Sequence, residues 1–147
     1  MKRASALALG GAAILLGAAS PPAEGEVVIS ITDLRSTKGV VRACMTTNPD
    51  IFPRCRKDPE SHRTVVDAAE NLELRFAGVK PGKYAIALLH DENDNGKADR
   101  ALGMMPKEGF GFSRDAKVRM GPPKFKDAVF DYTGKGQELT IKMRYLL

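Results

Sequence analysis

The sequence predicts an all-β protein: a single antiparallel β-sandwich of about seven strands, with one long loop rich in glycine and proline. Three observations lead to this prediction. Apolar and polar residues alternate with a period of two in several short segments after residue 26. Turn-forming residues, such as the run at 133–136, separate these segments. No long segment has the 3.6-residue apolar spacing that is typical of a helix.

The strands in the N-terminal half are predicted from their apolar faces. Val27, Ile29 and Ile31 share one side of the first segment, which spans 26–32. In the second segment, 40–46, we expect three residues to point inward: Val41, Ala43 and Met45. A third strand is expected at 63–66 and a fourth at 72–76, where leucine and phenylalanine alternate with Glu73 and Arg75.

The strands in the C-terminal half follow the same rule. We expect strands at 83–90, 128–132 and 138–145. The last of these has the clearest alternation, because its apolar side chains are separated by charged or hydroxyl residues. We expect the interior of the sandwich to include Tyr84, Ile86, Leu88, Leu139, Ile141 and Met143.

Composition and charge fit one globular domain. The chain has 147 residues, of which 43% are hydrophobic and 28% charged, and this excludes a coiled coil, a collagen or a wholly disordered chain. The formal charge is +5, but basic residues alternate with acidic ones and only 6% of residues are aromatic. Because nucleic-acid binding needs a concentrated basic surface, we expect no nucleic-acid partner.

The first residues have the pattern of an export signal. Lys2 and Arg3 give a positive start, residues 4–16 are apolar, and small residues follow at 17–20. A membrane anchor is the alternative, but the apolar run is shorter than the roughly 20 residues that cross a bilayer. We therefore expect a signal peptide at 1–22 and a single domain at 23–147. The mature protein is expected to be periplasmic or secreted, with no transmembrane segment.

Cys44 and Cys55 are the two cysteines of the chain. In an oxidising compartment an even number of cysteines favours a disulfide. We expect this disulfide to close a loop of about a dozen residues and to clamp it against the rim of the sandwich. A metal site is the alternative, but it needs two further soft ligands that the sequence does not supply.

A cluster of oxygen-bearing side chains follows the predicted strand at 83–90. It fits the D-x-[DN]-x-[DN]-G core of a calcium loop, in which alternate side chains converge on the ion and the glycine allows a sharp turn. Position twelve of an EF-hand loop, which needs a bidentate glutamate, is Leu102 here, so calcium binding is expected to be weak. Glu108 or Asp115 could complete the shell. The expected ligands are Asp91, Asn93, Asn95, the carbonyl of Lys97 and Asp99.

A plain hairpin turn is the alternative interpretation of this cluster. Asn95 and Gly96 form one of the commonest two-residue hairpin signals. A plain hairpin does not require Asp91 and Asp99 as well, and for this reason calcium is favoured.

The segment 103–125 is long and rich in glycine and proline. Loops of this length are usually functional or disordered, and aromatic residues such as Phe110 and Phe112 argue against disorder. We expect these two rings to cap the open end of the sandwich. The alternative is a surface for a partner, formed by Glu108, Phe110, Phe112, Arg114 and Asp115.

Three motifs, in this order, resemble the signature of a known family. They are HDENDNGKAD at 90–99, GMMPKEGFGFS at 103–113 and GPPKFKDAVF at 121–130. Over nearly all of its expected mature length the chain is similar to the family called domain of unknown function 2141, which consists of exported bacterial proteins. The resemblance implies a small exported β-sandwich, and it brings no catalytic residues with it. The PGKY turn at 81–84 also resembles transthyretin-like modules, so we expect an immunoglobulin-like or transthyretin-like sandwich.

Two classes of function follow. The favoured one is an exported, non-catalytic, calcium-stabilised module that binds a protein, a glycan or an envelope component through the loops between residues 91 and 125. The other is a metal-assisted hydrolase that uses the 90–115 region. Motifs of known hydrolases, such as a nucleophile elbow or paired histidines at ligand spacing, do not occur in the sequence.

Overall fold

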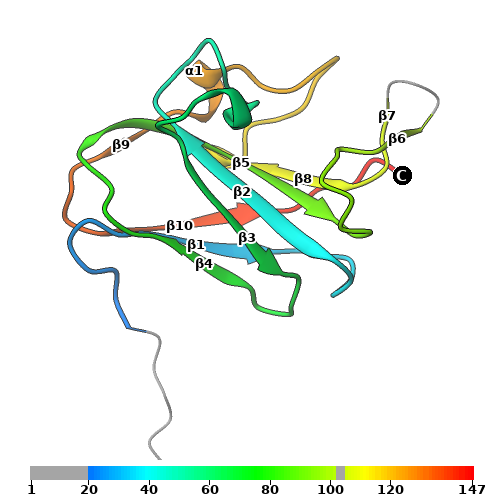
Figure 1. The fold of residues 1–147 in the computed structure, drawn as a ribbon, viewed down its shortest axis with the longest axis horizontal. Helices are drawn as coiled ribbons and strands as arrows, with labels where there is room; N and C mark the ends of the chain where they lie inside the picture. Colours follow the sequence, from blue (N-terminus) through cyan, green and yellow to red (C-terminus); the bar gives the residue numbers. More distant parts are fainter. Residues whose placement is uncertain (1–19, 102–104) are drawn as a thin grey trace, which may run out of the picture.

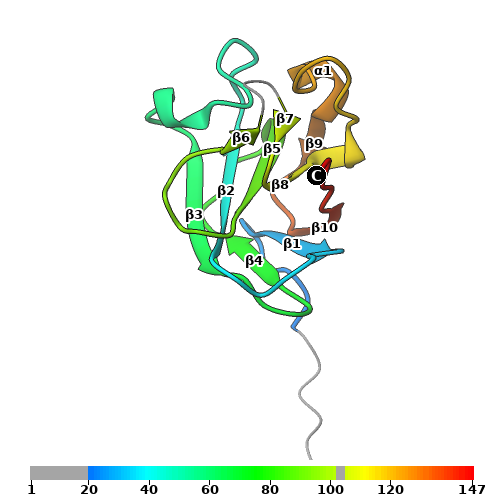
Figure 2. The ribbon, with the colours of Figure 1, turned by 90° about the vertical axis from the view of Figure 1, so that its right-hand side faces the viewer.

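The computed structural model describes residues 20–101 and 105–147. Almost all of the expected signal peptide therefore lies outside the described residues. Within them, eight strands form two sheets that pack face to face (Figures 1 and 2), and helix is confined to short turns. The predicted all-β sandwich is confirmed. No helix of the described residues is both long and apolar enough to traverse a bilayer.

The first sheet has the order β10-β1-β4. Its central strand is β1 (Val27–Thr32), which runs antiparallel to β4 (Glu73–Phe76) and parallel to β10 (Gln137–Lys142). The parallel pair corrects the prediction of a purely antiparallel sandwich. Period-two alternation determines which face of a strand is buried, but it carries no information on the direction of the neighbouring strand.

The second sheet has the order β3-β2-β5-β8, and all its neighbouring strands are antiparallel. A fifth strand, β9, pairs with the first residues of β5. The bounds of these strands are β3 (His62–Asp67), β2 (Val40–Thr46), β5 (Gly82–Asp91), β8 (Gly109–Phe112) and β9 (Phe130–Tyr132).

The core lies between the two sheets and contains the residues that the alternation places inward. Val41, Ala43 and Met45 of β2 are all buried, as predicted. The other predicted core residues are buried as well, except Leu139, which is partly buried against the same cluster. Together these side chains remove a continuous apolar layer from water, which is the main favourable contribution to folding.

Strand β8 is the main element that the sequence pattern did not predict. Its glycines lie where no side chain fits: a Cβ on Gly109 would come 2.3 Å from Tyr145 Cε1, and one on Gly111 would come 2.8 Å from Ile141 Cγ2. The close approach lets the chain beyond β10 cross to this sheet, where Arg144 pairs with Phe110 through two backbone hydrogen bonds. β8 therefore ties the two sheets together at one edge.

Short elements complete the fold. They are the 3-10 helices η1 (Cys55–Lys57) and η2 (Ser113–Asp115), the helix α1 (Phe125–Ala128), and the small hairpin of β6 (Arg100–Ala101) and β7 (Met105–Pro106). A second apolar cluster lies on the outer face of β5, around Ala85, and holds α1 and the loop before η1 against the sheet. Its members are Phe52, Ala85, Phe110, Phe112, Ala116 and Ala128.

Candidate functional site

The predicted calcium loop begins at the last residue of β5, and its first carboxylate is completely buried. Asp91 is 0% exposed and accepts hydrogen bonds from the backbone N–H groups of Asn95 (3.1 Å) and Gly96 (2.8 Å), so the loop curls around this side chain. Arg42 Nε on β2 donates a third, at 2.8 Å. Burial alone would raise the pKa of Asp91, but the Arg42 side chain and the two backbone donors outweigh it and lower the pKa.

Arg42 connects the loop to the sheet. Its guanidinium bonds Asp91 through Nε and Asp94 through Nη2, the latter at 2.7 Å. Because Arg42 alternates with the inward-pointing Val41 and Ala43, it leaves the core, but the alternation could not show that its side chain folds over the loop. Because it neutralises part of the negative charge, Arg42 holds two acidic residues close together.

The other predicted ligands meet at Asp99. The side-chain amides of Asn93 and Asn95 donate to the Asp99 carboxylate at 2.8–3.0 Å, and these bonds lower the pKa of Asp99. Lys97 is exposed, and its backbone N–H donates to Asn95 Oδ1 at 2.9 Å. The loop thus brings Asp91, Asn93, Asn95 and Asp99 into one hydrogen-bonded cluster, whereas the side chain of Lys97 stays outside it.

Glu108 adds a third carboxylate to this cluster from the turn between β7 and β8. It is only 5% exposed and accepts the Asp99 backbone N–H at 3.3 Å through Oε2. Burial, together with the negative charges of Asp91 and Asp99, raises its pKa to about 7. The sequence analysis named Glu108 and Asp115, the two acids of the glycine-rich segment, as residues that could complete the shell, and the structure brings Glu108 to the cluster.

The described geometry of the cluster is that of a loop closed by its own hydrogen bonds. All three of its carboxylates accept N–H donors from arginine, backbone or amide groups. In the described residues no group of three or more His, Cys, Asp or Glu side chains is arranged to hold a metal ion. A cation at Asp99 would have to take the place of the amide N–H donors of Asn93 and Asn95. Rotation of each amide group about its terminal bond permits this, because the rotation exchanges the positions of the amide nitrogen and oxygen.

His90, next to Asp91, is sealed in the protein. It is 0% exposed, and its ring nitrogens contact Tyr145 Oη at 2.7 Å and the Lys38 carbonyl at 2.8 Å. Since a carbonyl only accepts, Nε2 is the donor to Lys38. The guanidinium of Arg35 lies 4.4 Å from the centre of the Tyr145 ring and covers Tyr145 from outside. His90 therefore has a structural role, because neither ring nitrogen reaches solvent.

The residues of the expected partner surface divide into two groups. Phe110 and Phe112 are 8% and 7% exposed and pack in the second apolar cluster, and Glu108 is buried in the acidic cluster. All three side chains are buried, so they offer little area to a partner. Arg114 and Asp115 are exposed, although Asp115 also accepts the backbone N–H of Lys142 at 3.0 Å.

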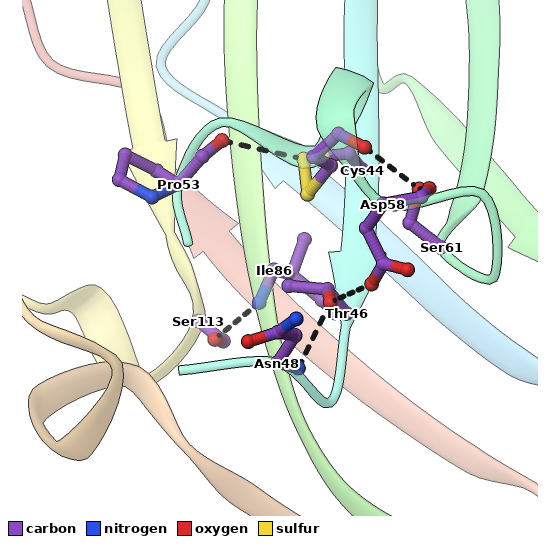
Figure 3. The surroundings of a disulfide bond; sticks show 9 residues. Cys44, Thr46, Asn48, Pro53, Asp58, Ser61, Ile86 and Ser113 are labelled. Atoms are coloured by element: carbon purple, nitrogen blue, oxygen red, sulfur yellow. Dashed lines mark hydrogen bonds between the residues drawn. A yellow bond between two sulfur atoms is a disulfide. The ribbon is translucent and has the colours of Figure 1, made fainter. Parts of the chain in front are cut away.

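The predicted disulfide between Cys44 and Cys55 is confirmed. Figure 3 shows its surroundings at the end of β2, where the Thr46 hydroxyl donates to buried Asp58 at 2.6 Å and the Asn48 N–H donates to Thr46 at 3.0 Å. The Ser61 hydroxyl also bonds the carbonyls of Cys55 and Asp58. Covalent and polar contacts together fix the loop that begins after β2.

Comparison with known proteins gives a family. Residues 29–140 match the model of the family described as an uncharacterized protein conserved in bacteria, DUF2141. No curated protein matches the chain, and no solved structure matches it. The match spans β1 to β10 and contains both the acidic cluster and the disulfide. The chain belongs to the DUF2141 family, as its three sequence motifs predicted.

Proposed function

We propose that the protein is an exported, non-catalytic β-sandwich module that is stabilised by calcium and binds a protein, a glycan or an envelope component through the loops between residues 91 and 125. One observation carries the calcium part of this proposal. Hydrogen bonds link Asp91, Asn93, Asn95, Asp99 and buried Glu108 into one cluster, and a rearrangement of these side chains would bring their oxygens around an ion.

Calcium would relieve an imbalance of charge in this cluster. Three carboxylates face one arginine, Arg42, which bonds Asp91 but has no hydrogen bond to Glu108 in the described structure. Burial is the main reason why the pKa of Glu108 is raised, and the negative charges of Asp91 and Asp99, which a cation would offset, raise it further. A hard cation with six to eight oxygen ligands accepts carboxylate and amide oxygens of this kind. Glu108 would then take the place of the acidic residue that is missing at position 102.

The affinity is expected to be low. Arg42 competes with the cation for Asp91, and Asn93 and Asn95 must turn before their oxygens can bind. We therefore expect a dissociation constant on the order of 10⁻⁴–10⁻³ M, as in extracellular calcium modules. At ten times that concentration, calcium would stabilise the fold by about 1.4 kcal/mol.

Export is supported by the N-terminal sequence pattern and by the disulfide, since disulfides persist in oxidising compartments. We expect the secreted protein to begin within residues 20–24. Intact mass of the native protein, measured before and after reduction, tests both the cleavage point and the disulfide. Alkylation of two thiols in the native, unreduced protein would contradict the disulfide.

A second candidate function is a metal-assisted hydrolase, and one observation favours it: Glu108, with a pKa of about 7, has the acidity of a general base at neutral pH. His90 offers it no help, because both ring nitrogens are occupied. A screen of ester, phosphoester and glycoside substrates with calcium or zinc distinguishes the two candidates. Turnover that Glu108→Gln abolishes would support the hydrolase.

The experiment for the favoured function is thermal unfolding in calcium, magnesium and chelator. We expect calcium to raise the melting temperature by several degrees and magnesium to raise it less, because the smaller ion loses its waters reluctantly. Asp91→Ala should abolish the calcium response. Asp94→Ala is the matched control, since Asp94 also pairs with Arg42 but is 58% exposed and off the ligand spacing. Equal loss in both variants would contradict a specific site.

A further inference from the structure

Two loops form one end of the sandwich. Residues 48–57 follow β2, and residues 117–126 lead from η2 into α1; both lie at the top of the view in Figure 1. We call these residues the basic loop end. The disulfide and the Thr46–Asp58 contact fix the first loop (Figure 3). The second is held where Phe125 packs edge-on against Phe52, with ring centres 6.1 Å apart.

An apolar groove of about 390 Å³ separates the two loops. Half of its lining residues are prolines, which have no N–H to donate, and the two aromatic rings supply no polar group. Met120, in the second loop, is completely exposed. The lining residues are Pro49, Phe52, Pro53, Pro122, Pro123, Lys124, Phe125 and Lys126.

Positive charge is concentrated in the two loops that border this groove, and Lys124 and Lys126 line it. The basic loop end contains seven basic residues and one acidic residue, Asp50, an excess larger than the formal charge of +5 on the whole chain. The structure describes six of these basic side chains, all but that of Arg56, and none of the six forms an ion pair with a described residue. Two neighbouring acids are occupied: Asp58 is buried and bonds Thr46, and Asp127 accepts the Lys124 backbone N–H.

We propose that the basic loop end docks onto a bilayer surface that contains anionic phospholipids. This inference rests on the proposed function and names its envelope component. The lysines and arginines would contact the lipid phosphates, while Met120 and the edge of the groove enter the interface between headgroups and acyl chains.

The groove chemistry favours lipid over a peptide or a glycan. A bound peptide or sugar would lose hydrogen bonds to water, and a wall of prolines and phenylalanines returns few of them. A hydrocarbon chain forms no hydrogen bonds with water and therefore loses none on entering the groove. An exposed methionine flanked by basic residues fits an interface that is apolar inside and anionic outside.

The test is binding of the mature protein to vesicles. Flotation with phosphatidylcholine vesicles is compared with flotation with vesicles containing about a third of phosphatidylglycerol, in buffer with chelator and in buffer with calcium. We expect binding only to the anionic vesicles, and release at high salt, which screens the charges. Equal binding to both kinds of vesicle, or to neither, would overturn the proposal.

Variants separate the charged contribution from the apolar one. Lys124→Gln with Lys126→Gln should weaken binding about 30-fold, and Met120→Ser about tenfold. The matched control is Lys38→Gln with Lys107→Gln, which removes two exposed lysines near the far end of β5 and should leave binding unchanged. Unchanged binding of the Met120 variant, or equal loss in the control, would indicate general attraction to polyanions and overturn bilayer docking.

Failure of this inference can be told apart from failure of the proposed function. The melting temperature of each variant is measured with calcium and with chelator in the same buffers. Absence of vesicle binding with an intact calcium response overturns only the lipid assignment. Absence of a calcium response overturns the calcium site whatever the vesicles show.

Discussion

Replacing Glu108 by glutamine tests the charge imbalance of the acidic cluster. Glu108 is 5% exposed, and its pKa rises from 4.5 to about 7 in the folded protein. Because the folded pKa is the higher one, protonated Glu108 stabilises the fold. This stabilisation is complete below pH 4.5 and is lost as pH rises through about 7. At 1.36 kcal/mol per pKa unit, the loss amounts to about 3 kcal/mol.

Glutamine keeps the shape of protonated Glu108 and cannot ionise. In chelator at pH 8, Glu108→Gln should therefore be more stable than the parent protein by up to about 3 kcal/mol, whereas at pH 5 the two should differ little. Urea unfolding at both pH values measures the difference. Glu70→Gln is the control, because Glu70 is exposed. The acids with lowered pKa, such as Asp91 and Asp99, lose their contribution only below about pH 4 and do not affect this window.

Calcium should reverse the order of stability of the parent protein and Glu108→Gln. If Glu108 is a ligand, saturating calcium at pH 8 stabilises the parent protein and not Glu108→Gln. A Glu108→Gln protein that is less stable than the parent at pH 8 in chelator would refute the charge argument. Equal stabilisation of the parent protein and of Glu108→Gln by calcium would show that Glu108 is not a calcium ligand.

Two further predictions concern the fold. Ile141→Ala should destabilise the protein by about 2–5 kcal/mol, as other core truncations do, because Ile141 is 0% exposed between the sheets; a loss below 1 kcal/mol in urea unfolding would contradict this position. Gly109→Ala should cost about 1–3 kcal/mol or more, since its Cβ would meet the Tyr145 ring. Gly78→Ala has open space at its Cβ but a φ of +66°, so a loss there measures backbone strain alone; a Gly109→Ala protein as stable as the parent would contradict the Tyr145 contact.

Much of the fold could be predicted because most strands have one buried face. In β10 the inward residues are apolar and their neighbours are polar, and in β2 Arg42 separates the inward Val41 and Ala43, so period two is visible in the sequence. In β8 the alternation is between glycine and phenylalanine, and the glycines face Tyr145 and Ile141. A pattern of this kind has the composition of a loop, and only the partner side chains show why glycine is required.

Only the part of the candidate site that lies within one short segment of sequence could be predicted. The spacing of Asp91, Asn93 and Asn95 reflects one turn of chain around one point, which is a local property. The contacts of Asp91 with Arg42 and of Asp99 with Glu108 join different parts of the fold. They depend on strand register, and hydropathy does not encode register between distant strands.

The most direct test of the central claim is a calcium titration of the isotope-labelled protein followed by amide resonances. The Gly96 N–H, which donates to Asp91, and the Asn95 N–H should shift and saturate with one dissociation constant on the order of 10⁻⁴–10⁻³ M. Magnesium at the same concentration should move them less. Resonances of this loop that do not respond to calcium up to several times that concentration would contradict a calcium site and leave a loop that is closed by its hydrogen bonds alone.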